Sequence, residues 1–342
     1  MSSLRRNPLN GEWIIIAPER RDRPNAITVE PEADDDPQQC PFCPGNEGQT
    51  PPEIMRVGSE DRWNLRVVPN RYPAVRSDAR RDHSPAADEL IDAGLDDEID
   101  MPADGSHEVI VESREHTLSA DGYSTEMLEC IFDIYEQRYA AQLDSSTPVR
   151  HVTIFKNSSS MSGASILHPH SQLLSLPVVP ARPAIELSQF ARRAGDCPLC
   201  AQLGRNRLFE SGRFLVVAPH ASRLPFQLLL APRAHTPSFF PLPAEPRREL
   251  AALLQMSLRA LAARLGRIPF NWTIQTSPME LGLGRREFHS YLELFPRLTT
   301  IGGFEWSSSS FINIVPPELA VVELRDAFER KGQRFPSGGD QT

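Results

Sequence analysis

The segment His168-Pro169-His170-Ser171-Gln172 carries the residue types and spacing that point most directly to chemistry. If this segment is a β-strand, His168, His170 and Gln172 lie on one side, because alternate side chains of a strand share a face. One strand then offers a metal ligand, a nucleophilic imidazole and an amide donor close together. Such a combination is typical of a nucleotidyl-transfer site.

A Cys-x-x-Cys pair occurs twice, at Cys40/Cys43 and at Cys197/Cys200, and two isolated histidines follow each pair at nearly equal intervals. The candidate ligand sets are Cys40, Cys43, His116 and His168 in the first half, and Cys197, Cys200, His235 and His289 in the second. Thiolate and imidazole ligands suit tetrahedral zinc, and four protein ligands leave no open position for a substrate. We therefore expect a tandem duplication with two structural zinc ions per chain.

The two copies differ just after their last ligand. His168-x-His170-x-Gln172 corresponds to His289-x-Tyr291-x-Glu293, so the second copy keeps a ligand histidine and lacks the second imidazole. We expect one active site per chain, in the first half, with Tyr291 filling the space of the missing ring.

Length and charge narrow the class of protein. The 342 residues suffice for about two domains, which we place at residues 1–180 and 181–342. A formal net charge of −9 argues against a nucleic-acid partner bound by bulk charge. The sequence has no apolar run long enough to span a membrane and no apolar signal-peptide stretch, so we expect no membrane partner and a cytoplasmic location. Four of the five cysteines fall in the two pairs, which is a metal pattern more than a disulfide framework.

Strand patterns outnumber helix patterns along the chain. Strands are expected at residues 13–17, 65–70, 107–112, 152–155, 214–219 and 226–230, and helices at residues 125–142 and 248–265. Each helix follows several strands, which predicts an α+β fold with a mostly antiparallel sheet and helices packed on one face of each half. His107, His151 and His220 match no motif, and we expect structural roles for them.

The chain resembles the galactose-1-phosphate uridylyltransferases of the histidine-triad superfamily over nearly its whole length. The matching stretches are Asn7-Pro8-Leu9-Asn10-Gly11-Glu12-Trp13, Cys40-Pro41-Phe42-Cys43, Val68-Pro69-Asn70, Gly163-Ala164-Ser165, His168-Pro169-His170-Ser171-Gln172 and Gly302-Gly303-Phe304-Glu305. Their order and spacing together are far more specific than any one of them. The resemblance implies two tandem histidine-triad-like halves, small-molecule substrates and a homodimer.

The resemblance also implies roles for individual residues. It makes His170 the nucleophile and Gln172 the amide that holds the transferred phosphoryl group. The positions that match substrate-binding residues are Arg20, Arg23 and Asn70 for the nucleotide, Asn157, Gly163 and Ser165 for the phosphate loop, and Glu305 for a sugar hydroxyl. Bland alternatives stay open: surface charge for the two arginines and for Glu305, and a simple tight turn for the loop.

The expected reaction exchanges a uridylyl group between UDP-glucose and galactose 1-phosphate through a covalent nucleotidyl-histidine, with ping-pong kinetics. The better-known branch of the superfamily carries a His-x-His where this chain has His289-Ser290-Tyr291, and the two-zinc branch also contains enzymes that use ADP-glucose. An adenylyltransferase or phosphorylase acting on ADP-glucose is therefore the alternative. Gln172 disfavours a nucleotide hydrolase because an amide cannot deliver a proton, and an intact His170 disfavours a non-catalytic nucleotide-binding module.

Overall fold

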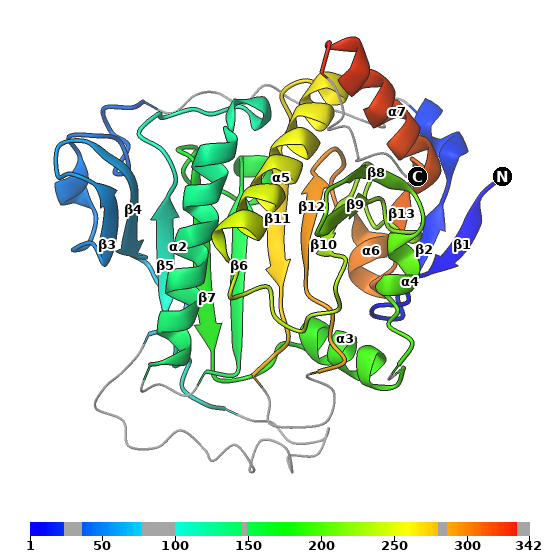
Figure 1. The fold of residues 1–342 in the computed structure, drawn as a ribbon, viewed down its shortest axis with the longest axis horizontal. Helices are drawn as coiled ribbons and strands as arrows, with labels where there is room; N and C mark the ends of the chain where they lie inside the picture. Colours follow the sequence, from blue (N-terminus) through cyan, green and yellow to red (C-terminus); the bar gives the residue numbers. More distant parts are fainter. Residues whose placement is uncertain (24–35, 77–99, 146–148, 194, 280–285, 334–342) are drawn as a thin grey trace.

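The computed structural model describes residues 1–23, 36–76, 100–145, 149–193, 195–279 and 286–333 (Figure 1). The strands are β1 (Ser3–Arg6), β2 (Trp13–Ile16), β3 (Met55–Gly58), β4 (Trp63–Pro69), β5 (His107–Val111), β6 (His151–Asn157), β7 (His170–Leu176), β8 (Arg207–Glu210), β9 (Phe214–Val217), β10 (Leu228–Pro232), β11 (Phe270–Gln275), β12 (Tyr291–Pro296) and β13 (Phe311–Asn313). The helices are α2 (Thr125–Leu143), α3 (Ala181–Ala191), α4 (Cys200–Leu203), α5 (Ala244–Leu265), α6 (Gly303–Ser308) and α7 (Pro317–Arg330). Short 3₁₀ turns are η1 (Pro18–Asp22), η2 (Glu47–Gln49), η3 (Ala120–Gly122) and η4 (Ser160–Ser162).

A sheet of ten strands in the described part of the chain runs in the order β3-β4-β5-β7-β6-β11-β12-β10-β9-β8. Every neighbouring pair in it is antiparallel. A smaller sheet has the order β1-β2-β13, in which β13 runs parallel to β2. The expected α+β fold with a mostly antiparallel sheet is therefore confirmed. Because β6 pairs with β11, the large sheet continues across residue 180; the division into domains at that residue stays a prediction.

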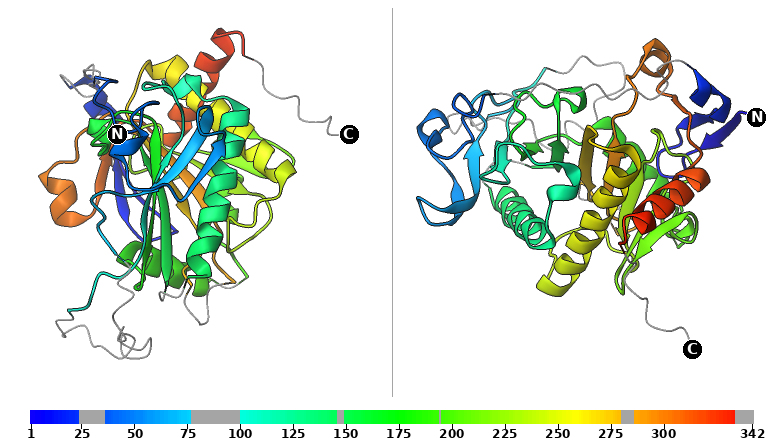
Figure 2. Two further views of the ribbon diagram at one scale, coloured as in Figure 1. Left: turned by 90° about the vertical axis from the view of Figure 1, so that its left-hand side faces the viewer. Right: turned by 90° about the horizontal axis from the view of Figure 1, so that it is seen from above.

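One face of the large sheet is covered by α2, α5 and α7 (Figure 2). Helix α2 contacts β6 and β7, α5 contacts β8, β9 and β10, and α5 also packs against α2 and α7. Helix α2 begins where the sequence predicts, because the Ser124 side chain accepts a hydrogen bond from the Met127 N–H at 3.1 Å. Helix α5 begins earlier than predicted, at Ala244, since Pro246 lies in the first turn, where its missing N–H has no intrahelical partner.

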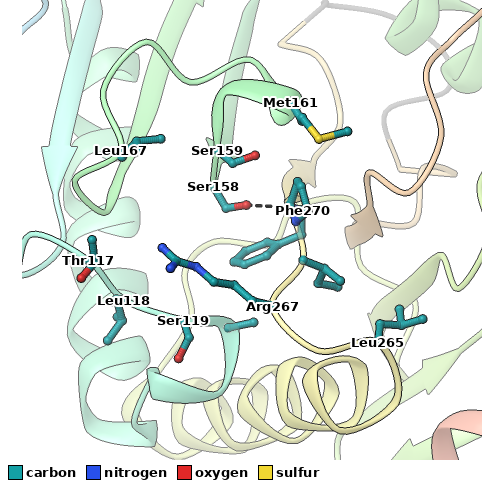
Figure 3. A pocket seen from close by; sticks show the side chains of 13 residues that line it. Thr117, Leu118, Ser119, Ser158, Ser159, Met161, Leu167, Leu265, Arg267 and Phe270 are labelled. Atoms are coloured by element: carbon teal, nitrogen blue, oxygen red, sulfur yellow. Dashed lines mark hydrogen bonds between the residues drawn. The ribbon is translucent and has the colours of Figure 1, made fainter. Parts of the chain in front are cut away.

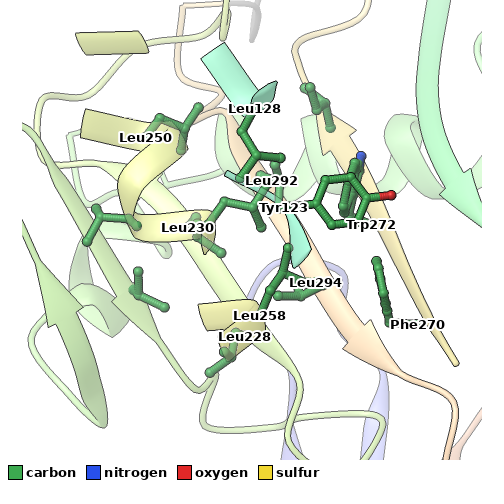
Figure 4. Close-up of a cluster of buried hydrophobic side chains, with 14 of the residues drawn as sticks. Tyr123, Leu128, Leu228, Leu230, Leu250, Leu258, Phe270, Trp272, Leu292 and Leu294 are labelled. Carbon is green, nitrogen blue, oxygen red and sulfur yellow. The ribbon is translucent and has the colours of Figure 1, made fainter. Parts of the chain in front are cut away.

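The core lies between this helical layer and the sheet (Figure 4). Leu228 and Leu230 of β10, with Leu292 and Leu294 of β12, point toward α5 and are almost fully buried. Each such leucine contributes about 2 kcal/mol through the apolar surface it removes from water. The strand predicted to begin at residue 226 begins instead at Leu228, because the left-handed backbone of Phe226 (φ 61°) cannot continue a strand.

The opposite face of the sheet differs between the two halves. In β6 and β7 buried side chains alternate with partly exposed ones, so the face away from α2 is open to solvent in part. In the second half that face is covered, since Leu187 and Phe190 of α3 pack on Leu215, Val217 and other apolar side chains of the sheet. Among the residues that the structure describes, the part of the sheet face that carries His170 is therefore open, whereas the corresponding part in the second half is covered.

Candidate active site and metal centres

His170 is the first residue of β7 and is buried, with 5% of its surface exposed. Its Nδ1 lies 2.8 Å from the His168 carbonyl oxygen, and because a carbonyl can only accept, Nδ1 carries the ring proton. The Nε2 lone pair is then free to attack an electrophile. Burial lowers the pKa of His170 to about 4, so at neutral pH the imidazole is uncharged and its Nε2 lone pair is available.

The register of the strands gathers the other predicted residues around His170. Gln172 pairs with Phe155 of β6 and with Val109 of β5, so it faces the open side as His170 does. Asn157 ends β6 on the same face, beside the start of β7. His168 precedes β7 and is not part of the strand, which lets its ring turn away from this face toward the cysteines.

The loop between β6 and β7 is tied to the sheet through Asn157. Its Nδ2 donates to the Gly163 carbonyl at 3.2 Å, and its Oδ1 accepts from Asn271 Nδ2 at 2.7 Å. Gly163 has a left-handed φ of 97°, and an added Cβ would come within 3.3 Å of Asn157 Nδ2. Ser165 is exposed in the same loop. The structure thus places the three predicted phosphate-loop residues in one loop, and the backbone conformation at position 163 requires a glycine. Their role in binding phosphate stays a prediction.

A pocket of about 340 Å³ lies beside this loop, where β6 ends and β11 begins (Figure 3). Ser158 and Ser159 line one side, and Arg267 extends into it. Thr117, which follows the candidate ligand His116, and Leu167, which precedes the candidate ligand His168, also line the pocket. The pocket therefore adjoins the loop, and two of its lining residues are chain neighbours of candidate metal ligands.

The first predicted ligand set is assembled in the structure, with its four ligand atoms within 4.8 Å of one another. His168 Nδ1 lies 3.7 Å from Cys40 Sγ and 3.5 Å from Cys43 Sγ, and His116 Nδ1 lies 3.3 Å from Cys43 Sγ. Tetrahedral zinc, with Zn–S near 2.3 Å and Zn–N near 2.0 Å, would separate sulfur and nitrogen ligands by roughly 3.5 Å. The donor set and its spacing fit zinc.

The second set is assembled in the same way. His289 Nδ1 lies 3.5 Å from Cys197 Sγ and 3.3 Å from Cys200 Sγ, while His235 Nδ1 lies 4.0 Å from Cys200 Sγ. The other ring nitrogen of each histidine faces a carbonyl oxygen: His289 Nε2 donates to Pro232 at 2.9 Å and His235 Nε2 to Arg286 at 3.1 Å. These bonds fix the tautomer that leaves Nδ1 free for a metal, as His168 does through Ser113 at 2.8 Å.

The thiols need a cation to become ligands. Burial raises the pKa of the Cys43 thiol to about 12, and its neighbour Cys40 adds to the shift. Burial likewise raises the pKa of the Cys200 thiol to about 12. When bound, a zinc ion would stabilise the thiolates and hold the loops that bear them. We expect metal analysis of the purified chain to find about two zinc ions, from two complete ligand sets; one ion, or iron at the second set, would contradict this.

Comparison with known proteins places the chain in a family. Residues 1–180 match the family model described as galactose-1-phosphate uridyl transferase, N-terminal domain. The chain belongs to this family. An ADP-glucose phosphorylase of Arabidopsis thaliana is 31% identical to it, over 94% of this chain and 92% of the relative. A galactose-1-phosphate uridylyltransferase of Thermotoga maritima is 25% identical, over 95% and 98% of the two chains.

The fold agrees with this assignment. The crystal structure of an ADP-glucose phosphorylase from Arabidopsis thaliana with bound ADP-glucose superposes with a TM-score of 0.79 and 29% identity, covering 95% of this chain and 99% of the other. The family resemblance expected from the motifs is confirmed. Nucleotidyl transfer is the chemistry of the family. The names of the relatives differ, since one names ADP-glucose and the other names galactose 1-phosphate and a uridylyl group.

A buried ion pair lies directly behind His170 in this member of the family. Lys156 Nζ is 2.5 Å from Glu112 Oε2 and donates to the His170 carbonyl at 3.1 Å. Tyr123 donates its hydroxyl to Glu112 at 3.0 Å, and the ammonium lies over the Trp272 ring at 5.3 Å from the centroid. Burial lowers the pKa of Lys156, whereas Glu112 opposes that shift. The pair anchors the start of β7 from the side opposite to the open face.

Replacing Lys156 with methionine should lower the free energy of unfolding by about 3 kcal/mol, because the Glu112 carboxylate loses its only cationic partner among the described residues. Urea denaturation measures this change. The double variant K156M/E112Q removes the uncompensated charge and should recover part of the loss. If the destabilisation of the double variant equals the sum of those of K156M and E112Q, the ion pair does not account for the loss of stability in K156M.

The second half carries a different buried network where the first has His170 and Gln172. Tyr291 donates to Glu186 of α3 at 2.9 Å, and Arg182 donates to Glu293 at 2.8 Å. Burial alone would raise the pKa of Glu293, but Arg182 and Arg223 outweigh it and the pKa falls. Tyr291 therefore does more than fill space, as it joins α3 to the sheet. The expectation of one active site per chain gains a physical reason, because α3 closes this face.

Three predicted binding residues lie apart from His170 within the chain. Arg20 and Arg23 lie in and next to η1, which Arg21 ties to α7 through Glu323 at 2.6 Å. Glu305 lies in α6, which contacts β13, and its carboxylate accepts from the Gly302 N–H at 3.0 Å. Helices α6 and α7 lie toward the β8 end of the large sheet, whereas β7 lies nearer the β3 end (Figure 1). Within one chain these three residues do not meet His170, and their substrate-binding roles stay predictions.

The motifs did not indicate several residues that touch the site. Phe42, between the two cysteines, packs on His170 with ring centroids 5.4 Å apart. The position of Phe42 inside the Cys-x-x-Cys loop could have indicated a contact with the site. Lys156, Glu112 and His107 offered no comparable signal, since strand pairing alone brings them to β7.

Proposed function

We propose that the chain is a nucleotidyltransferase that moves a nucleoside monophosphate from a nucleoside diphosphate sugar to a phosphate-bearing acceptor through a covalent adduct on His170. The observation that carries this proposal is the buried, uncharged imidazole whose Nδ1 proton is held by the His168 carbonyl at 2.8 Å. It leaves Nε2 as a nucleophile on the open face. Family membership supports the same reaction class.

In the first step, Nε2 attacks the α-phosphorus, a new N–P bond forms, and the bond from phosphorus to the bridging oxygen breaks. The leaving group is a sugar 1-phosphate, whose second pKa of about 6 lets it depart without a general acid. In the second step, an oxygen of the acceptor phosphate attacks the same phosphorus and restores the imidazole. Splitting the displacement in this way gives ping-pong kinetics.

Gln172 has the role of a hydrogen-bond donor in this scheme. Its amide can stabilise the charge that builds up on a phosphoryl oxygen during attack, and such preorganised donors are worth about 10²-fold in rate. Asn157 and the Gly163 loop frame the same face, where backbone N–H groups could approach phosphate oxygens. The sheet positions these groups before substrate arrives.

Two donors are candidates. Transfer of a uridylyl group between UDP-glucose and galactose 1-phosphate is supported by relatives named galactose-1-phosphate uridylyltransferase, at 25% identity for that of Thermotoga maritima. Phosphorolysis or transfer with ADP-glucose is supported by the Arabidopsis ADP-glucose phosphorylase at 31% identity and by its structure with bound ADP-glucose. In this proposal the two reactions share His170 as the nucleophile and differ in the nucleotide base and in the acceptor.

The mass of the intact protein tests the proposal. The chain is mixed with UDP-glucose, and separately with ADP-glucose, without acceptor. A UMP-sized adduct that disappears on addition of galactose 1-phosphate identifies the first activity. An AMP-sized adduct from ADP-glucose, removed by inorganic phosphate or a sugar phosphate, identifies the second. Absence of an adduct from either donor, under conditions where product forms, would contradict the covalent route.

We also propose a cytoplasmic homodimer. The described chain has no helix that is both long and apolar enough to cross a membrane. Arg20, Arg23 and Glu305 lie apart from His170, so they would act by completing the site of a second chain. Trp13 of β2 is 51% exposed and Trp306 of α6 is 77% exposed. Both elements adjoin β13, and we propose that the two tryptophans pack against the second chain.

Mixing inactive variants tests the shared site. Two preparations, H170A and Arg20→Ala, are unfolded and refolded together so that mixed dimers form. One site of a mixed dimer then holds both native residues, and activity should exceed that of either variant alone. A mixture no more active than the sum of its parts would show that Arg20 does not serve a partner.

A further inference from the structure

We propose that His107 is a positioning residue that turns the amide nitrogen of Gln172 toward the transferred phosphoryl group. This inference rests on the proposed function and deepens it. It explains why the Gln172 amide turns its NH₂ donor, and not its oxygen acceptor, toward the phosphoryl group. The juxtaposition that carries it is the contact of His107 Nε2 with Gln172 Oε1 at 2.7 Å.

The tautomer of the His107 ring follows from its other neighbour. The backbone N–H of Ala74 lies 3.1 Å from His107 Nδ1. A backbone N–H can only donate, so Nδ1 must offer its lone pair and the ring proton of the neutral imidazole is on Nε2. The turn after β4 therefore decides which nitrogen of His107 is the donor.

The orientation of Gln172 follows in turn. A protonated Nε2 donates and needs an acceptor, and the amide oxygen of Gln172 is the atom that can accept. With Oε1 held in this way, the NH₂ group of Gln172 is the end left for the substrate. A flipped amide would set two donors against each other and lose the bond to His107.

Asn70 repeats the arrangement with a second donor. The Tyr72 N–H donates to Asn70 Oδ1 at 2.9 Å, so Nδ2 of Asn70 is turned toward the other two side chains, 3.4 Å from Gln172 Oε1 and 3.2 Å from His107 Nε2. Because His107 Nε2 already carries the ring proton, the atom that can accept from Asn70 Nδ2 is Gln172 Oε1. The oxygen of Gln172 has two lone pairs and can accept from both donors. Asn70, which the sequence indicated as a nucleotide-binding position, thus contacts the same amide as His107.

Strand pairing brings these groups together. His107 and Val109 are alternate residues of β5, and Val109 pairs with Gln172, so His107 is the diagonal neighbour of Gln172 on the same face. Asn70 follows β4 and its N–H donates to the His107 carbonyl at 2.8 Å. Backbone groups of one turn thus determine, through His107 and Asn70, which end of Gln172 faces the substrate.

The test is a double-mutant cycle read out as the rate of adduct formation in a single turnover. His107→Phe keeps a planar ring and removes the donor, and should slow adduct formation about tenfold or more, as expected when a transition-state donor is misaligned. His107→Gln keeps an N–H near the position of Nε2 and should recover most of this loss. In a Gln172→Ala background, H107F should slow the reaction little further, because the group it orients is gone.

Controls separate positioning from folding. His220→Phe, a histidine of the second half that does not contact Gln172, should react like the wild type, and the melting temperature and metal content of each variant are measured. If H107F does not fold, His107→Met replaces it in the same cycle. Adduct formation by H107F at the wild-type rate would overturn the inference, as would an equal slowing in the presence and absence of Gln172. A wild-type chain that forms no adduct with UDP-glucose or ADP-glucose would overturn the proposed function and the inference together.

Discussion

Replacing His170 with alanine should abolish the nucleotidyl adduct and reduce exchange of label between sugar 1-phosphate and nucleotide sugar by at least about 10⁴-fold. The variant keeps the open face, Gln172 and the loop around Gly163, so it should still bind substrate. It loses the Nε2 lone pair that the proposed attack on the α-phosphorus requires. Isotope exchange and intact mass measure the two losses independently.

Metal content is the control for this variant. His170 is not a member of either ligand set, so H170A should retain the same number of zinc ions as the wild type. Loss of the ring removes its contact with Phe42, which should lower the melting temperature only modestly. Normal exchange in a zinc-replete, folded H170A would show that the nucleophile lies elsewhere.

The matched variants Cys40→Ser and Cys197→Ser should have unequal consequences for chemistry and similar ones for stability. Each removes one thiolate from a four-ligand site, and the lost metal free energy is lost folding free energy. Cys40 shares its site with His168, which precedes the nucleophile by two residues and provides the carbonyl that holds the Nδ1 proton of His170. Cys40→Ser should therefore lower adduct formation by about a hundredfold as well as losing one zinc ion.

Cys197→Ser should lose the other ion and destabilise the second half. Its site lies next to α4 and the covered face of the sheet, so adduct formation per folded molecule should stay close to that of the wild type. Zinc content, melting temperature and the single-turnover rate are measured on both variants. A Cys197→Ser protein that melts normally and has lost the chemical step would contradict a structural role for the second site.

Much of this candidate site could be predicted from the sequence, because the patterns that indicate it either involve residues close together in the chain or occur twice. The Cys-x-x-Cys pairs and their histidines named both ligand sets, since the same spacing occurs twice and only a few residue types bind zinc well. Helix α2 was predicted to within a residue of its observed end, because Ser124 caps it and apolar residues recur at helical spacing. His170 and Gln172 were indicated by alternation along one strand.

What the tertiary structure decided was which distant residues meet these groups. Lys156 and Glu112 reach the back of His170 only through the pairing of β5, β6 and β7, and no local pattern states that register. The turn at Tyr72 and Ala74 orients Gln172 through bonds made by backbone N–H groups, which every residue but proline carries and which leave no mark in the sequence. The sequence by itself indicated the candidate nucleophile and the two candidate ligand sets, because the chemistry of a side chain depends on its residue type. Closure of the second face by α3 and the orientation of the Gln172 amide were decided by packing and strand register, which depend on contacts between residues far apart in the chain.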